Sequence, residues 1–289
     1  MENQKSEILK NNSITDTALD YDAATHIGSS QGEGLPQNKV YTMKYLKTGV
    51  PGFDELIDVG IPRGSQVLIS GGPGTSKTTF CLQLLVHGAK NNEKCLFLSF
   101  EEDTEKLIYY MRKYGWDPDE LIKNGNLLIK KLDPFKISRS VETLLAQARG
   151  ELLIETNQVK DLIPDDFIPD RIVLDSLSAV AAGFFGKDEG YRAYISQIFD
   201  TFRKIGATSF LISEIEHSTT KYSQSGVEEF LADAVFVFYN LRQGTQRINA
   251  TEIVKIRGTS HKKRIVPFKI NSGKGVVVYP MEELFFDDK

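Results

Sequence analysis

The stretch Gly71-Gly72-Pro73-Gly74-Thr75-Ser76-Lys77-Thr78 follows a short apolar run at residues 67–69 and precedes a second apolar run that starts at Phe80. This order predicts a strand, a glycine-rich loop and a helix. Backbone N–H groups can face an anion only where the chain turns tightly without obstruction by Cβ atoms, and the N-terminus of the following helix adds its dipole. The stretch is therefore interpreted as a phosphate-binding loop for a nucleoside triphosphate.

Within this loop, Lys77 is expected to bridge phosphates and Thr78 to ligate magnesium. The pattern G-x-x-x-x-G-K-[ST] fails only at Ser76, where the backbone must accept a Cβ or relax slightly. A Gly/Pro turn that merely happens to precede a helix is the alternative, although the context that the motif requires is present on both sides. With ATP and Mg²⁺ as ligands, the expected nucleotide-binding residues are Gly72, Pro73, Gly74, Thr75, Ser76, Lys77, Thr78 and Thr79.

The composition is that of an ordinary globular chain. Its 289 residues are 40% hydrophobic, and the formal net charge of −4 gives no global basic field that would favour nucleic acid as the main ligand. No apolar run approaches the ~20 residues of a membrane span, and the start of the chain lacks the apolar core of a signal peptide, so we expect no membrane partner and a cytoplasmic location. Cys81 and Cys95 stand in apolar contexts and are expected to be buried thiols.

The order of patterns along the chain predicts an α/β fold. Residues 1–40 are polar and without apolar periodicity, which predicts a flexible tail, and residues 41–289 are expected to form a single domain. An amphipathic helix is expected at residues 141–155, followed by an acidic loop at 161–170. Parallel strands covered by helices are predicted first, and antiparallel hairpins after Asp233. The expected strands lie at residues 67–70, 95–100, 127–130, 172–175 and 209–213, and then at 234–238, 249–256, 265–270 and 275–279.

Carboxylates stand at the ends of two of these strands. Asp175 ends an apolar run about a hundred residues after the loop, where a carboxylate can hold magnesium together with Thr78. Glu101 and Glu102 follow the strand at 95–100, and one of them could orient and deprotonate the water that attacks ATP. The alternative is that this acidic pair only starts the helix expected at residues 104–114; both can hold at once.

Several separately placed motifs together resemble the KaiC branch of the RecA-like ATPases. The resemblance spans roughly residues 41–280, and its motifs occur in the order of that family. It implies a RecA-like phosphate-loop core with a mostly parallel, twisted sheet flanked by helices. Besides the phosphate loop, the motifs are Thr48-Gly49 to Leu56, Phe100-Glu101-Glu102, Tyr114-Gly115-Trp116-Asp117, Leu174-Asp175-Ser176, Gly226-Val227-Glu228-Glu229-Phe230 and Lys255-Ile256-Arg257-Gly258-Thr259-Ser260-His261.

The resemblance further implies a homo-oligomeric ring, most often of six subunits, with ATP held between neighbours. Lys255 and Arg257 would then project onto the γ-phosphate of the next subunit, and Thr259 and His261 would lie beside the same nucleotide. Their spacing places Lys255 and Arg257 on one face of the expected strand, with Ile256 on the other. A solvated pair of charges on an edge strand is the alternative.

One departure from the family concerns the position of its autophosphorylated Ser and Thr residues. Glu229 and Phe230 stand there, without a hydroxyl group. Autokinase activity is therefore not expected. The resemblance instead implies slow ATP hydrolysis, with the nucleotide state read by an unknown protein partner.

Two other functions stay open from the sequence. The first is a recombinase-like ATPase that binds single-stranded DNA through loops at residues 182–192 and 216–225; the first loop offers aromatic side chains, but its charge is mixed. The second is a scaffold that senses ATP and scarcely hydrolyses it. Exchanging Glu101 and Glu102 for Gln distinguishes such a scaffold from an ATP-driven motor, because a scaffold would keep its assembly and a motor would lose its cycle.

Overall fold

The computed structural model describes residues 43–137, 162–184, 188–215, 222–223 and 226–284. The tail expected at residues 1–40 and the helix expected at residues 141–155 lie outside the described residues. The fold described below is that of the unit Tyr45–Lys289.

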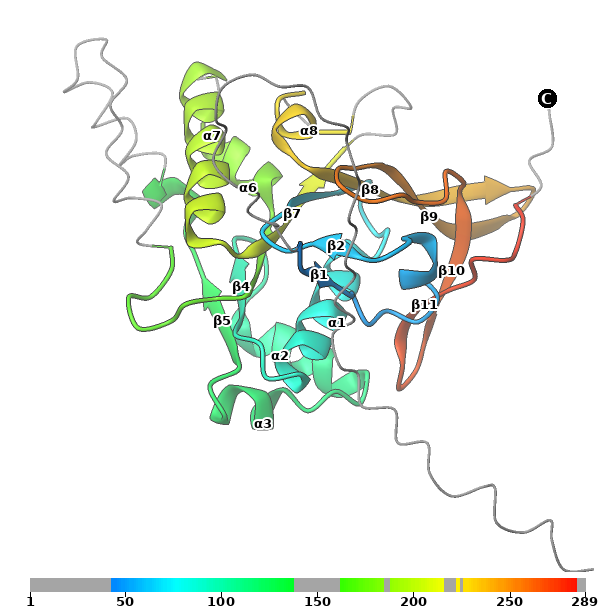
Figure 1. Ribbon diagram of the computed structural model, residues 1–289, viewed down its shortest axis with the longest axis horizontal. Coiled ribbons are helices and arrows are strands. Elements are labelled where there is room, and N and C mark those ends of the chain that lie inside the picture. Colours follow the sequence, from blue (N-terminus) through cyan, green and yellow to red (C-terminus); the bar gives the residue numbers. More distant parts are fainter. Residues whose placement is uncertain (1–42, 138–161, 185–187, 216–221, 224–225, 285–289) are drawn as a thin grey trace, which may run out of the picture. The chain divides into compact units, whose positions relative to one another are not determined.

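Nine of the described strands form one sheet, in the order β11-β10-β9-β8-β3-β7-β6-β4-β5 (Figure 1). The six strands from β8 to β5 run parallel, and β9, β10 and β11 are added antiparallel at the β8 edge, which confirms the predicted fold class. The strands are β3 (Gln66–Gly71), β4 (Cys95–Ser99), β5 (Leu127–Lys131), β6 (Arg171–Asp175), β7 (Thr208–Glu214), β8 (Ala234–Gln243), β9 (Gln246–Ile256), β10 (Val266–Asn271) and β11 (Gly275–Val278).

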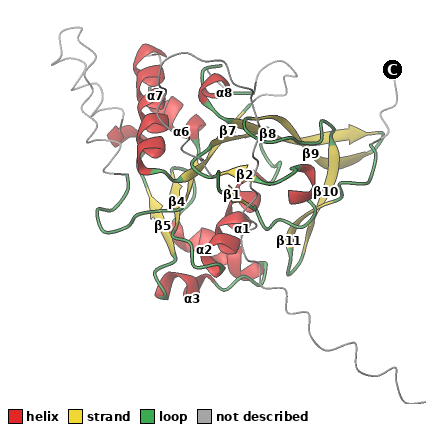
Figure 2. Cartoon of the chain, in the orientation of Figure 1, coloured by secondary structure: helices red, strands yellow, loops and turns green. Residues whose placement is uncertain are grey.

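Helices cover both faces of this sheet (Figure 2). The central strands are buried on both sides, so they read as continuous apolar runs whose side chains alternate between two cores. In β3, for example, Val67 and Ile69 belong to the core under α1, and Leu68 belongs to the core under α6 and α7. The helices are α1 (Lys77–Lys90), α2 (Thr104–Lys113), α3 (Pro118–Lys123), α6 (Leu177–Gly183), α7 (Asp188–Ile205) and α8 (Glu228–Leu231).

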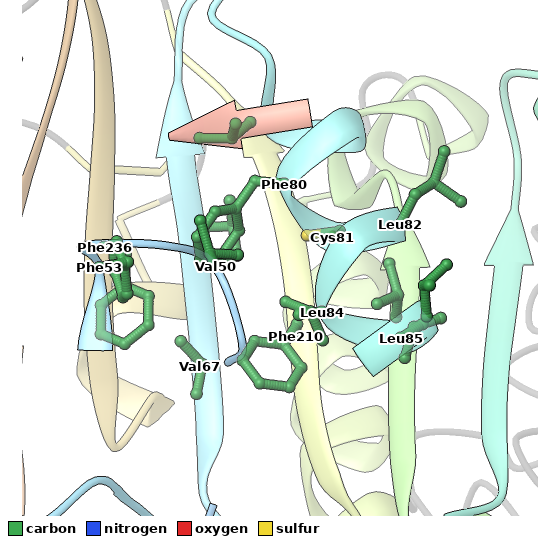
Figure 3. Packing of buried hydrophobic residues seen from close by; sticks show 14 of the residues in the cluster. Val50, Phe53, Val67, Phe80, Cys81, Leu82, Leu84, Leu85, Phe210 and Phe236 are labelled. Atoms are coloured by element: carbon green, nitrogen blue, oxygen red, sulfur yellow. The ribbon is translucent and has the colours of Figure 1, made fainter. Parts of the chain in front are cut away.

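The core under α1 is rich in aromatic rings. Figure 3 shows side chains of α1 and of the neighbouring strands gathered between the helix and the sheet. The ring of Phe53 lies 4.8 Å from that of Phe80 and 5.1 Å from that of Phe236, measured between centroids. With the contact of Phe80 and Phe238, whose ring centroids lie 4.9 Å apart, they hold the start of α1 against β8. Cys81 and Cys95 are buried free thiols, as predicted.

The segment before β3 is held in its conformation by hydrogen bonds to one of its own side chains, the carboxylate of Asp54. It contains β1 (Tyr45–Leu46), the 3-10 turn η1 (Asp54–Leu56) and β2 (Ile61–Pro62), which pairs with β1. The Asp54 carboxylate accepts from the N–H and the hydroxyl of Thr48, both at 2.8 Å, and from the Gly49 N–H at 2.9 Å. Gly49 has φ +69°, and a Cβ there would lie 2.0 Å from the His87 ring. Hydrogen bonds therefore join Thr48-Gly49 to the Gly52-Phe53-Asp54 stretch and hold Phe53 in the core.

A bulge interrupts the pairing of β8 with β9. Val235 pairs with Lys255, but the next residue, Phe236, pairs with Ile253, so Val254 is the extra residue. A bulge shifts the alternation of side chains by one position. Ile253 and Ile256 consequently reach the same core although they are three residues apart.

Candidate nucleotide site

The phosphate loop connects the end of β3 to the first turn of α1, as the sequence predicted. Pro73 and Gly74 are exposed at its tip, and the Thr75 hydroxyl donates to the Gly72 carbonyl at 2.8 Å. Ser76, which precedes α1, has φ +70° and ψ +23°. Ser76 thus has the left-handed backbone conformation that glycine, the usual residue at this position of the motif, adopts readily.

Lys77 lies almost completely buried beneath the loop. Its Nζ donates to the Gly72 carbonyl at 2.8 Å and lies 3.6 Å from the Glu214 Oε1. Burial lowers the pKa of Lys77, while Glu214 and Asp175 raise it in part. The ammonium group is therefore a positive charge with little water around it, which strengthens its attraction for a phosphate.

Thr78, the residue after Lys77, contacts Asp175. The Thr78 hydroxyl, in the first turn of α1, donates to Asp175 Oδ2 at the end of β6, at 2.7 Å. Burial raises the pKa of Asp175 to about 7, and the Thr78 hydrogen bond acts in the opposite direction. A buried carboxylate and a hydroxyl side by side are hard oxygen ligands of the kind Mg²⁺ prefers. The donor set therefore fits a magnesium ion bound together with phosphates; Thr79, half-buried, follows in the same helical turn.

The two carboxylates after β4 point to different partners. Glu101 accepts a short hydrogen bond from the Ser176 hydroxyl, next to Asp175, and its charge acts on Asp175 and on Lys77. Glu102 instead pairs with Lys106 of α2, at 2.5 Å. The two carboxylates therefore differ in position: Glu101 lies beside Ser176 and Asp175, and Glu102 is paired with the first turns of α2. The peptide between Asp175 and Ser176 is cis.

Two residues of this cluster had no role assigned from the sequence: Ser176, although it lies in the quoted motif Leu174-Asp175-Ser176, and Glu214. Glu214 ends β7 directly opposite Gly71 of β3, and its N–H donates to the Ser178 hydroxyl at 2.7 Å. The signal for it was available, because the carboxyl ends of parallel strands meet at one edge of a sheet and Glu214 follows the predicted strand at 209–213.

Lys255 and Arg257 lie at the other end of the central strands. Arg257 pairs with Asp233 (Nη1 to Oδ1, 3.2 Å), and Asp233 accepts from the N–H of Gln66, the first residue of β3, at 3.0 Å. Since β3 leads from Gln66 to the phosphate loop over about 16 Å, the guanidinium of Arg257 cannot reach the loop of its own chain. Lys255 donates to the Glu229 carbonyl at 2.9 Å; burial and then the charge of Arg257 lower its pKa.

Thr259 and His261 follow on the same segment. This stretch docks on the residues around η1, where His261 bridges to Ile57 and the Ser260 carbonyl accepts from the Asp58 N–H at 3.0 Å. Burial lowers the pKa of His261, with Lys263 acting in the same direction. The described backbone contacts thus tie the stretch from Ser260 to Lys262 to η1 and the two residues after it, while the Thr259 hydroxyl donates to the Ser260 carbonyl at 3.5 Å.

The two loops considered for DNA binding are described only in part. Residues 216–221 and 224–225 lie outside the described residues. In the first stretch, α7 already begins at Asp188, so residues 188–192 are helical and not a loop. Phe184 and Tyr191 are buried, at 3% and 6% exposure, and Tyr191 donates to Glu228 at 2.6 Å. These two rings pack in the core and are not free to stack on bases.

Fold and site together define a RecA-like phosphate-loop protein. The model of the KaiC ATPase family matches residues 46–283. This chain belongs to the KaiC family of RecA-like ATPases, as the motifs indicated.

Known relatives agree with this assignment. The chain is 32% identical over 244 residues to the circadian clock protein KaiC3 of Synechocystis sp., covering 84% of this chain and 47% of that protein. It is 31% identical to the circadian clock oscillator protein KaiC of Acaryochloris marina, over 87% of this chain and 47% of that protein. The crystal structure of a KaiC-like protein from Pyrococcus horikoshii superposes with a TM-score of 0.66 at 29% identity, covering 82% of this chain and 100% of that one. The chain thus spans about half the length of the curated relatives it matches.

Proposed function

We propose that this protein is a magnesium-dependent ATPase that assembles into a homo-oligomeric ring, most simply of six subunits, with each ATP held between two neighbours. A protein partner would read the nucleotide state of the ring. One observation carries the shared-site part of the proposal: Arg257 lies at the start of β3 and the phosphate loop at its end. If Arg257 acts on a nucleotide, that nucleotide belongs to another subunit.

The chemistry of the proposed site follows from the charges of its residues. Lys77 places a desolvated ammonium group against the phosphates. Thr78 and Asp175 would hold Mg²⁺, which neutralises charge on the phosphate oxygens. Glu101, held by Ser176, would orient the attacking water and accept its proton. Lys255 and Arg257 of the neighbouring subunit would add positive charge beside the γ-phosphate, whose oxygens carry negative charge during phosphoryl transfer to water.

Membership of the family supports ATP as the ligand. The relatives named as clock proteins are about twice as long as the matched region, so a role in a clock does not transfer to this chain. The Glu229 carboxylate accepts from the Ser223 hydroxyl at 2.6 Å and from the Tyr222 N–H at 3.2 Å. It is part of a local hydrogen-bonded turn at the position where autophosphorylated relatives carry hydroxyl groups, which favours hydrolysis over autokinase activity.

The test is the molar mass in solution by light scattering, with and without Mg²⁺–ATP, together with phosphate release in the presence and absence of single-stranded DNA. The proposal expects a nucleotide-dependent ring whose hydrolysis is indifferent to DNA. Hydrolysis that DNA stimulates would favour the recombinase-like function instead. A stable ring with no measurable phosphate release would favour the ATP-sensing scaffold.

A further inference from the structure

Glu214 occupies a place in the site that the hydrolytic chemistry does not account for. It pairs in register with Gly71, where the phosphate loop begins, and β7 lies between β3 and β6 in the sheet. Its carboxylate therefore stands between the phosphate loop on one side and Asp175 on the other. Its backbone is fixed, because the Ser178 hydroxyl accepts from its N–H at 2.7 Å and the following N–H donates to the Gly71 carbonyl at 3.3 Å.

Three carboxylates act on the charge of Lys77, but only one contacts it. Asp175 is engaged by Thr78, and Glu101 is engaged by Ser176. The Glu214 carboxylate lies 3.6 Å from Lys77 Nζ, and among the described ion pairs Lys77 is its partner. The side chain of Lys77 is 5% exposed and that of Glu214 is 42% exposed, so the pair reaches solvent through the carboxylate.

A carboxylate in this place opposes the binding of phosphates in two ways. It competes for the donors of Lys77, and it repels the negative charge of a phosphate that contacts the same ammonium group. Because Glu214 lies between the loop and the expected magnesium ligand Asp175, the terminal phosphate of a triphosphate comes nearer to it than a diphosphate does. The opposition is therefore stronger for ATP than for ADP.

We propose that Glu214 sets the nucleotide affinity of the site by acting as a counter-charge to Lys77, which weakens ATP binding more than ADP binding. This inference rests on the proposed function only in requiring that the phosphate loop binds nucleotide. It makes Glu214 a residue that tunes affinity, separate from the residues that assist hydrolysis.

The experiment compares Glu214→Gln with the wild type by isothermal titration calorimetry, with Mg²⁺–ATPγS and Mg²⁺–ADP as probes. Partial exposure screens the carboxylate, so we expect a gain of about three- to tenfold in affinity for ATPγS and a smaller gain for ADP. The gain should shrink between about 50 and about 500 mM KCl, because it is electrostatic. Glu105→Gln removes the same charge from the exposed face of α2 and should leave both affinities unchanged.

The outcomes separate this inference from the proposed function. A wild-type protein that binds neither probe contradicts the proposed function itself. A wild type that binds, with Glu214→Gln binding ATPγS equally or more weakly, overturns the inference alone. Thermal melting checks that the variant folds; if it does not, Glu214→Asp, which withdraws the carboxylate by one methylene, must show a smaller gain in the same direction.

Discussion

The hydroxyl of Thr78 donates to the carboxylate of Asp175 at 2.7 Å, which joins the first turn of α1 to the last residue of β6. The two residues are far apart in the sequence, and the order of strands brings them to one edge of the sheet. This contact places two oxygen atoms of the kind that Mg²⁺ prefers beside the phosphate loop.

Asp175→Asn tests the metal site. Asn keeps an acceptor for the Thr78 hydroxyl but loses the charge that attracts Mg²⁺, so the fold should survive. We expect the variant to lose most of the gain in ATP affinity that Mg²⁺ confers, by about tenfold or more. Titrating ATP in the presence of Mg²⁺ and then of EDTA measures this gain. An unaltered response to Mg²⁺ would show that Asp175 is not a ligand.

The different partners of Glu101 and Glu102 predict different effects on hydrolysis. Glu101→Gln should slow phosphate release by about a hundredfold or more, because the water loses its proton acceptor. Glu102→Gln should change the rate only a few-fold, because its carboxylate pairs with Lys106 on the surface. Single-turnover phosphate release with both variants, at equal nucleotide occupancy, checks this. Equal losses in the two variants would contradict the separation of their roles.

The phosphate loop was predictable in detail because its chemistry is local. A strand, a glycine turn and a helix N-terminus follow one another in the chain. Lys77 and Thr78, the residues expected to contact phosphate and magnesium, come directly after the turn. The apolar strand ending in Asp175 was predictable for the same reason. The alternation of apolar runs and helices also sufficed for the parallel sheet with its antiparallel edge.

The contacts between strand ends were not predictable to the same degree. The pairing of Lys77 with Glu214 depends on β7 lying next to β3, which nothing local in the sequence specifies. The bulge at Val254 belongs to the register in which β9 pairs with β8, which the sequence of β9 alone does not specify. The early start of α7 at Asp188 was missed because Gly186 and Gly190 gave the stretch the composition of a loop.

Ser76 offers a prediction about stability. A residue with a Cβ in the left-handed region costs about 1 kcal/mol relative to glycine. Ser76→Gly should therefore raise the melting temperature by about 2–4 °C. The higher conformational entropy that glycine gives the unfolded chain reduces this gain. Calorimetric melting without nucleotide measures it, and ATP binding should be retained. A lowered melting temperature would mean that the serine side chain makes a compensating contact.

Glu93 provides a prediction about pH. It accepts short hydrogen bonds from Arg171, which is buried, and from Arg63. Burial raises the pKa of Glu93, but the hydrogen bonds and charges of Arg171 and Arg63 outweigh it and hold the pKa below its ordinary value of 4.5. A lowered pKa means that this stabilisation is complete above pH 4.5 and is lost as the pH falls through the lower value of the folded state.

Glu93→Gln should consequently destabilise the fold by about 2–4 kcal/mol at pH 7, because it leaves the buried charge of Arg171 without its counter-charge. The difference from the wild type should shrink as the pH falls below 4.5. Urea unfolding at a series of pH values measures both. A difference that does not depend on pH would mean that packing, and not charge, explains the loss.

Each nucleotide site is proposed to be shared between two neighbouring subunits, and mixing two inactive variants tests this arrangement. Lys77→Ala destroys the phosphate loop but keeps Arg257, and Arg257→Ala does the reverse. If the variants co-assemble at random in equal amounts, about a quarter of the interfaces combine an intact loop with an intact Arg257, and hydrolysis should recover to about that fraction of the wild-type rate. Mixed oligomers, confirmed by co-purification through a tag on one variant, that stay as inactive as their components would contradict the shared site.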